Sequence, residues 1–244
     1  MAGHSHWAGI KHKKGKQDKL RSKIFSKISR EITVAAKLGS KDPSINHRLR
    51  TAIEVAKEAN MPKDNINRAI SKSEVDKNQN FQSLRYEGFG PKNVALIMET
   101  LTENKNRTAA SIRTILQKHG GNLGNSGSTA HFFYNCGVIQ IEKKNISDEK
   151  ALEFAVNAGA KDCKSDKSFH EIITKKEDFY KVKNEIEKLT KDFIYSNMEW
   201  RPYNLINIPK ENFKDIENML ELLQEDDDVQ NVFHNCKLGQ LILR

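Results

Sequence analysis

The sequence predicts an α+β protein in which an N-terminal three-helix domain is followed by two ferredoxin-like α+β domains, one inserted in the other. Over the first 70 residues, apolar side chains recur at helical spacing. Beyond residue 80, short runs rich in β-branched and aromatic residues alternate with helical patterns. Residues 138–200 follow the order β-α-β-β-α-β, and the flanking segments give the same order when they are joined.

The N-terminal third is expected to form three helices, at residues 20–38, 43–60 and 63–71. Gly39 ends the first helix, and Asp42 with Pro43 is expected to cap the second. Residues 1–19 lack an apolar helical period, so we expect a mobile arm that an anionic partner would order.

After a polar linker at residues 71–80, strands and helices alternate. The expected strands are 84–87, 94–101, 130–134, 138–141, 161–164, 169–174, 193–200, 205–208, 229–233 and 240–243. The expected helices are 107–119, 147–158, 176–189 and 210–224. The chain then divides into a basic helical domain at 1–77, a discontinuous α+β domain at 78–135 plus 203–244, and an inserted α+β domain at 136–202.

The basic excess of this 244-residue chain lies in its N-terminal third. Residues 1–77 carry 18 Lys and Arg against 8 Asp and Glu, whereas the remaining residues carry 23 against 24. A strongly basic module on a near-neutral body indicates a polyanion partner. A solvated lysine-rich face is the alternative interpretation.

Other classes of protein are disfavoured. The sequence has no run of about 18 apolar residues and no secretory signal, so we expect a cytoplasmic protein without a membrane partner. Its three cysteines are too widely spaced for a zinc finger or a disulfide scaffold. The glycine-rich stretch 120–127 follows a helix, which predicts a helix end plus a loop. A contact of its backbone with an anion or with RNA is the alternative interpretation. The acidic run 225–228 is expected to be a solvated turn. We expect no enzyme, cofactor or metal site.

Cations and one aromatic residue of the basic third are the candidate nucleic-acid contacts. Trp7 has two open interpretations, stacking on a base or packing on the helical core. The candidate residues are Trp7, Lys11, His12, Lys13, Lys14, Lys16, Lys19, Arg21, Lys23, Lys27, Arg30, Lys63, Asn65 and Arg68.

Several long motifs resemble those of the YebC/PmpR family, and the similarity covers essentially the whole chain. They include GHSHWAGIKHKK at 3–14, NMPKDNI at 60–66, YEGFGP at 86–91, KHGGNLG at 118–124 and DDVQNV at 227–232. The resemblance implies a three-domain protein, described in bacteria as a cytoplasmic DNA-binding transcriptional regulator. It also implies an alternative, since mitochondrial relatives are translational activators and some bacterial members are linked to the ribosome.

The sequence therefore leaves two functions open. The family assignment favours a transcriptional regulator that binds DNA. The excess of Lys over Arg, and a third helix that offers only Asn65, Asn67 and Arg68 as base readers, favour ribosomal RNA. In either case the expected partner is a nucleic acid, or the ribosome, and the protein is expected to be a monomer.

Overall fold

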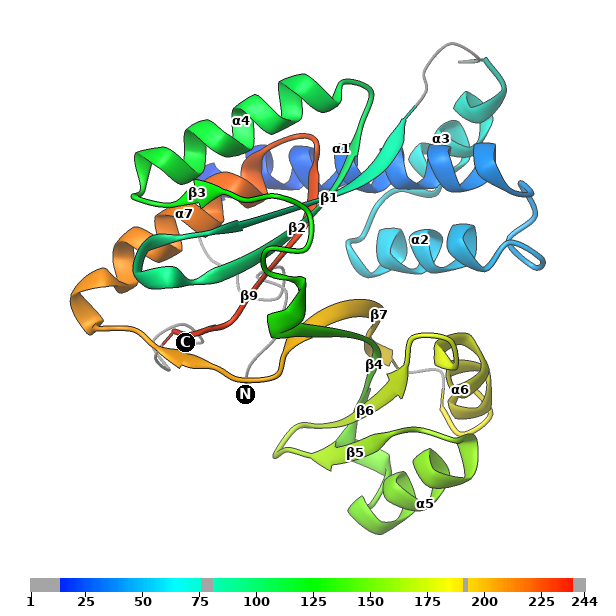
Figure 1. Ribbon diagram of the computed structural model, residues 1–244. Helices are drawn as coiled ribbons and strands as arrows, with labels where there is room; N and C mark the ends of the chain where they lie inside the picture. The colour runs from blue at the N-terminus through cyan, green and yellow to red at the C-terminus, as the bar shows by residue number, and fades with distance from the viewer. Residues whose placement is uncertain (1–13, 76–80, 191–192, 239–244) are drawn as a thin grey trace. The chain divides into compact units, whose positions relative to one another are not determined.

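The structure is a computed structural model that describes residues 14–75, 81–190 and 193–238 (Figure 1). The chain forms two compact units, one comprising residues 1–133 with 202–244 and the other residues 134–201. The α+β class with an N-terminal helical region is confirmed. The expected division into three domains says which segments of the chain would fold independently, and it stays a prediction.

Three helices open the first unit: α1 (Lys14–Leu38), α2 (His47–Glu58) and α3 (Lys63–Val75). Their apolar faces meet in one core, in which Ile32 and Leu49 are fully buried. The first helix begins six residues earlier than the apolar pattern predicts, because lysine and glutamine are good helix formers even without an apolar stripe.

The start of α2 differs from the prediction. Its N-cap is Asn46, whose side chain accepts a hydrogen bond from Leu49 N at 3.0 Å. The Asp42 side chain instead accepts from Ser44 N at 2.8 Å, in the turn before the helix. A local Asx turn thus uses the carboxylate that the sequence suggested as the cap.

The main sheet of the first unit has the strand order β3-β1-β2-β9. These strands are β1 (Gln82–Phe89), β2 (Ala95–Thr102), β3 (Asn122–Leu123) and β9 (Val229–His234). The central strand β2 pairs antiparallel with β1 and with β9, although β9 lies far along the chain. The helices α4 (Lys105–Lys118) and α7 (Phe213–Glu225) share an apolar core with this sheet (Figure 1).

Two expected strands of the first unit require correction. Residues 130–134 are not a strand of the main sheet, since a short 3₁₀ helix (Ala130–Phe132) leads directly into β4 (Phe133–Glu142). The strand expected at 205–208 is only β8 (Ile206–Asn207), which pairs parallel with β10 (Cys236–Lys237). The expected strand 240–243 lies outside the described residues.

The second unit folds in the ferredoxin-like order that the sequence predicts. It comprises β4, α5 (Asp148–Ala158), β5 (Asp162–Ser165), β6 (Phe169–Lys175), α6 (Phe179–Ile186) and β7 (Phe193–Pro202). The sheet order is β5-β6-β4-β7, so the hairpin strand β6 lies beside β4. Its apolar core includes residues of both helices.

Strand β4 runs without a break through Gly137, which lies between the expected strands 130–134 and 138–141. A Cβ at this position would lie 2.3 Å from the ring of Phe179, the first residue of α6. The glycine therefore permits close packing of the helix on the strand rather than ending the strand.

Candidate nucleic-acid interface

The structure describes only part of the predicted interface. Trp7, Lys11, His12 and Lys13 lie outside the described residues. Lys14, Lys16 and Lys19 lie in α1, but the structure describes only their backbone and not their side chains. The remaining candidates lie on α1 and α3.

Three predicted cations of α1 contact the end of α7 and the turn that follows it. Lys23, Lys27 and Arg30 occur at i, i+4 and i+7, so they share one face of the helix. The Lys23 amine donates to the Glu225 carbonyl at 3.0 Å, and its ion pair with the Glu225 carboxylate is 3.7 Å long. Arg30 Nη1 donates to Asp227 O at 2.8 Å and to Asp228 Oδ1 at 3.0 Å.

Lys27 departs most from the expectation of a solvent-facing cation, because only 5% of the residue is exposed. Its amine donates to Gln224 O at 2.5 Å and to Val229 O at 2.6 Å. Burial lowers the pKa of Lys27 to about 8, although the nearby Asp226 and Asp227 favour its charged form. In this structure the amine is therefore occupied within the protein.

The expectation that residues 225–228 form a solvated turn is wrong for Asp228, because its side chain is only 5% exposed. Besides Arg30, its carboxylate accepts hydrogen bonds from Arg107 Nη2 at 2.8 Å, Thr108 Oγ1 at 2.8 Å and Thr102 Oγ1 at 3.1 Å. Burial alone would raise the pKa of Asp228, but the hydrogen bonds from Arg107 and Thr108 hold it below its usual value. The only sign of this role in the sequence is the position of Asp228 directly before the expected strand 229–233.

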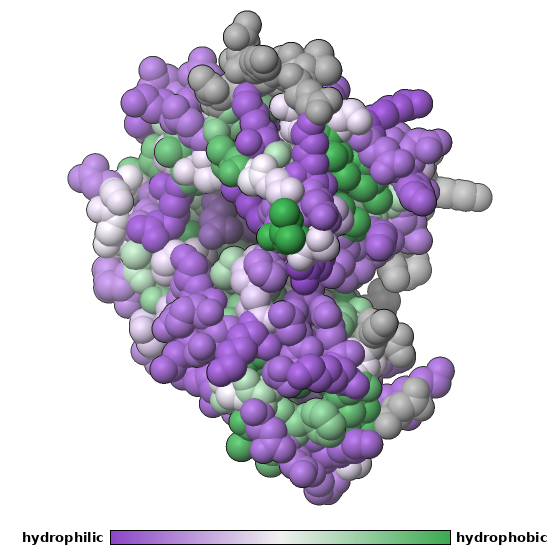
Figure 2. All heavy atoms as spheres, turned by 90° about the vertical axis from the view of Figure 1, so that its right-hand side faces the viewer, coloured by the Kyte–Doolittle hydropathy of each residue, from purple (hydrophilic) through white to green (hydrophobic). Residues whose placement is uncertain are grey.

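The cations of α3 remain accessible. Lys63, Arg68 and Lys72 are exposed, and among the described residues none of the three has an ion-pair or hydrogen-bond partner. Arg68 and Lys72 are one turn apart, and Asn65 lies on the same stripe. Arg21 is also exposed, with its guanidinium 5.3 Å from the centre of the Phe25 ring. Hydrophilic residues make up most of the surface visible in Figure 2.

The glycine-rich loop after α4 uses its amides within the protein. Gly121 N donates to Leu116 O at 2.8 Å, and Gly124 N donates to Glu87 O at 2.8 Å. The Glu87 carboxylate in turn accepts from the amides of Thr129 at 2.8 Å and Ala130 at 2.9 Å. These contacts favour a helix end plus loop over a phosphate cradle.

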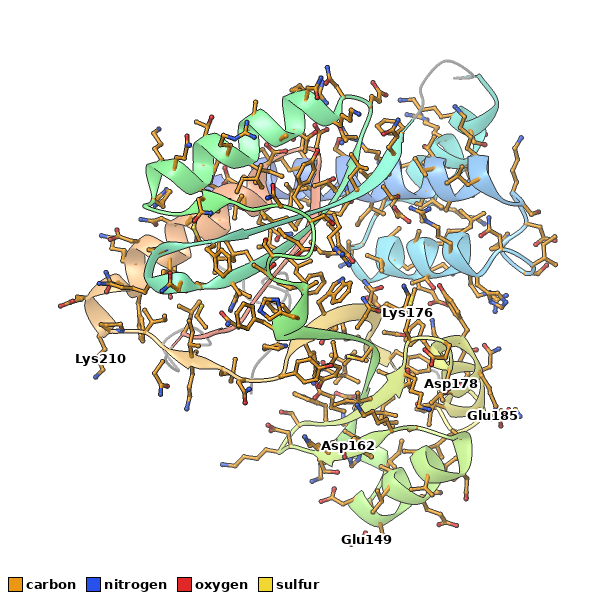
Figure 3. All side chains as sticks on the ribbon, in the orientation of Figure 1. Glu149, Asp162, Lys176, Asp178, Glu185 and Lys210 are labelled. Atoms are coloured by element: carbon orange, nitrogen blue, oxygen red, sulfur yellow. The ribbon has the colours of Figure 1, made fainter. Side chains whose placement is uncertain are left out.

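The second unit has no excess of either charge, because residues 134–201 carry 13 basic and 13 acidic residues. Side chains of both signs project from it, for example Glu149, Asp162 and Lys176 (Figure 3). A polyanion is therefore attracted more strongly to the helical segment than to this unit.

The described residues provide little for other kinds of chemistry. No group of three or more His, Cys, Asp or Glu side chains in the described ranges could hold a metal ion. Burial raises the pKa of the Cys136 thiol to about 11 and that of Cys236 to about 12, which disfavours the nucleophilic thiolate. No helix within the described part of the chain is long and apolar enough to cross a membrane.

Family models match both parts of the chain. Residues 5–75 match the TACO1/YebC protein N-terminal domain, and residues 81–236 match the TACO1/YebC second and third domain. The chain belongs to the TACO1/YebC family. This confirms the resemblance that the sequence motifs indicate.

Individual relatives of this TACO1/YebC chain are similar over their full lengths. A probable transcriptional regulatory protein of Pelagibacter ubique is 54% identical over 96% of this chain and 98% of its own. A protein of the same description from Zymomonas mobilis is 47% identical over 100% of this chain and 98% of its own. The crystal structure of a conserved hypothetical protein from Aquifex aeolicus is 42% identical, with a TM-score of 0.84 over 98% of this chain and 100% of that one. The names of the curated relatives describe a regulatory protein rather than an enzyme.

Proposed function

We propose that this protein is a nucleic-acid-binding regulator of gene expression, and specifically a DNA-binding transcriptional regulatory protein of the YebC/PmpR type. The observation that carries the proposal is the concentration of positive charge, since residues 1–77 have a net charge of +10 and the rest of the chain is near neutral. The names of the curated relatives support a role in transcription.

Phosphate contacts supply most of the binding free energy in this proposal. The arm and the exposed cations Arg21, Lys63, Arg68 and Lys72 neutralise phosphates, which makes affinity depend strongly on salt. Asn65 and Arg68, from neighbouring turns of α3, supply the polar groups closest to a base-reading role.

A ribosome-associated translation factor that binds ribosomal RNA is the second candidate. It is favoured by the small number of base-reading side chains on α3 and by the preponderance of lysine in the arm. Lysine acts as a point charge towards phosphate and carries little sequence information.

The two candidates separate when the full chain is titrated with a DNA duplex and with ribosomal particles at equal physiological salt. Tighter binding to the duplex supports the DNA proposal, and tighter binding to ribosomal particles replaces it with the translation role. In both assays, the double variant Arg68→Ala/Lys72→Ala should reduce the salt slope, which is the slope of the logarithm of the binding constant against the logarithm of the salt concentration. The expected reduction is about two units, about one for each lost cation.

The matched control is Lys176→Ala/Lys181→Ala, which removes two exposed lysines from the second unit. The control should leave the salt slope close to that of the unmodified protein. Equal effects of the two double variants would mean that binding follows total charge rather than this surface, and the assignment of α3 would then be abandoned.

A further inference from the structure

Hydrogen bonds and ion pairs join α1 to the end of α7, whereas its buried apolar side chains other than Val34 pack in the core shared with α2 and α3. Ile28 and Ile32 of α1 belong to the core shared with α2 and α3. The apolar core of the main sheet and its helices contains no residue of α1, α2 or α3 within the described ranges. The row of three cations joins α1 to the end of α7 and the residues after it. Arg30 also contacts the sheet, since its Nη1 donates to Leu101 O at 3.1 Å and its guanidinium lies 5.2 Å from the centre of the Phe81 ring.

The groups that bind this cation row resemble a polyanion in their chemistry. They are the carbonyl oxygens of Gln224 and Glu225 at the C-terminus of α7, those of Leu101, Asp227 and Val229, and the carboxylates of Glu225 and Asp228. A helix C-terminus carries partial negative charge, and the last turn of α7 contains no basic residue of its own. Lysine and arginine make the same charge-assisted hydrogen bonds to carboxylate and to phosphate oxygens.

We propose that residues 224–229 are an internal competitor for the polyanion, holding Lys23, Lys27 and Arg30 in a closed state that a nucleic acid opens. This inference rests on the proposed nucleic-acid binding and adds its regulation. In the open state the three cations contact phosphates and extend the basic surface of the arm along α1.

Opening takes the Lys27 and Arg30 donors from the carbonyls of Gln224, Val229 and Leu101, but it does not leave the buried Asp228 carboxylate without partners. Asp228 keeps its hydrogen bonds to Thr102, Arg107 and Thr108, which all lie outside the helical segment. The Lys23–Glu225 pair is weak, because its side chains are 33% and 50% exposed and such surface pairs contribute about 0–1 kcal/mol. The lowered pKa of Lys27 indicates that its charge is costly to bury, which also reduces the net stability of the closed state.

A double-mutant cycle on the full chain tests the proposal, with fluorescence-labelled mixed-sequence DNA duplex as the probe. Asp228→Asn weakens the hold on Arg30, so one more phosphate contact forms. We expect affinity to rise roughly threefold to tenfold at ~0.1 M salt and the salt slope to steepen by about one unit. The double variant Asp228→Asn/Arg30→Gln should lose this gain, because the released cation is absent.

Glu225→Gln is the second variant and keeps the test decisive if Asp228→Asn fails to fold, because the Glu225 side chain is half exposed. It should raise affinity by a smaller factor through Lys23. The control is Glu221→Gln, which removes an exposed acid from the same helix and should change affinity by less than about twofold.

Two results would overturn the competitor model while leaving the proposed function intact. In the first, the Asp228→Asn and Glu225→Gln variants fold but bind DNA with unchanged affinity and unchanged salt slope. In the second, the gain in affinity of Asp228→Asn persists in the double variant that lacks Arg30. Absence of binding by the unmodified protein and by every variant would instead refute nucleic-acid binding, and the competitor model with it. Binding that appears only in the two released variants would support the closed state directly.

Discussion

Replacing Glu87 should destabilise the first unit more than any substitution of an exposed acid. The Glu87 side chain is 0% exposed and pairs with Arg85 Nη2 at 3.1 Å. Its Oε2 also accepts from the buried amide of Thr129 and from the amide of Ala130. Glu87→Ala leaves these donors without their acceptor, and hydrogen bonds to a charged group are each worth about 1.5–3 kcal/mol. Because the loop relaxes in part, we expect a loss of about 3–5 kcal/mol in the free energy of unfolding.

Glu87→Gln isolates the charge from the hydrogen bonds. The amide oxygen still accepts from the loop, but the ion pair with Arg85 is lost, so the expected loss falls to about 1–2 kcal/mol. Urea unfolding followed by far-ultraviolet circular dichroism gives the midpoint and slope for each variant. The exposed Glu103→Gln is the control and should lie within about 0.5 kcal/mol of the unmodified protein. A loss below about 1 kcal/mol for Glu87→Ala would refute the assigned role of this carboxylate in holding the loop.

Four further outcomes are expected. The pKa values of Glu87 and Asp228 lie below their usual values, so both carboxylates stabilise the fold above about pH 4.5. The melting temperature should therefore drop as the pH falls through these lowered pKa values, and Glu87→Gln should make this drop smaller. Gly121→Ala should cost about 1–3 kcal/mol in urea unfolding, because the new Cβ would lie 2.3 Å from a backbone carbonyl oxygen; a neutral effect would show that the backbone can yield. The fragment 134–201 should unfold cooperatively on its own, since its sheet is complete, and a non-cooperative melt would contradict its independence. If Trp7 stacks on a base, Trp7→Ala should weaken binding to single-stranded or looped nucleic acid by about 1–3 kcal/mol and leave the melting temperature unchanged. A lower melting temperature with unchanged affinity would instead indicate that Trp7 packs on the helical core.

The elements that depend on local patterns could be predicted from the sequence. The helices α2, α3 and α5 and the ferredoxin-like order of the second unit follow from apolar spacing and from short β-rich runs. The sequence predicted two strands, 130–134 and 138–141, where the structure has the single strand β4, and only the position of Phe179, about forty residues along the chain, explains Gly137 within it. The pairing of β2 with β9 depends on contacts too distant for any local pattern to specify.

The candidate site was predictable in its charge but not in its contacts. Helical spacing puts Lys23, Lys27 and Arg30 on one face, yet it says nothing of what lies opposite that face. The partners of Asp228 come from three separate segments, so the sequence suggested only a solvated acidic turn. The placement of Asp228 immediately before the buried strand β9 was the one available signal.

The antiparallel pairing of β2 with β9 has a consequence for synthesis of the protein on the ribosome. Ala95 N donates to Asn235 Oδ1 at 2.9 Å across 140 positions of the sequence, so the main sheet closes only after nearly the whole chain has been made. At about 5–20 residues per second, that interval lasts on the order of ten seconds. Within it the inserted unit is completed, whereas the edge of β2 that β9 later covers stays unpaired and open to association with other chains. The insert therefore folds before the sheet that surrounds it in sequence, and the nascent first unit is the stage most vulnerable to aggregation.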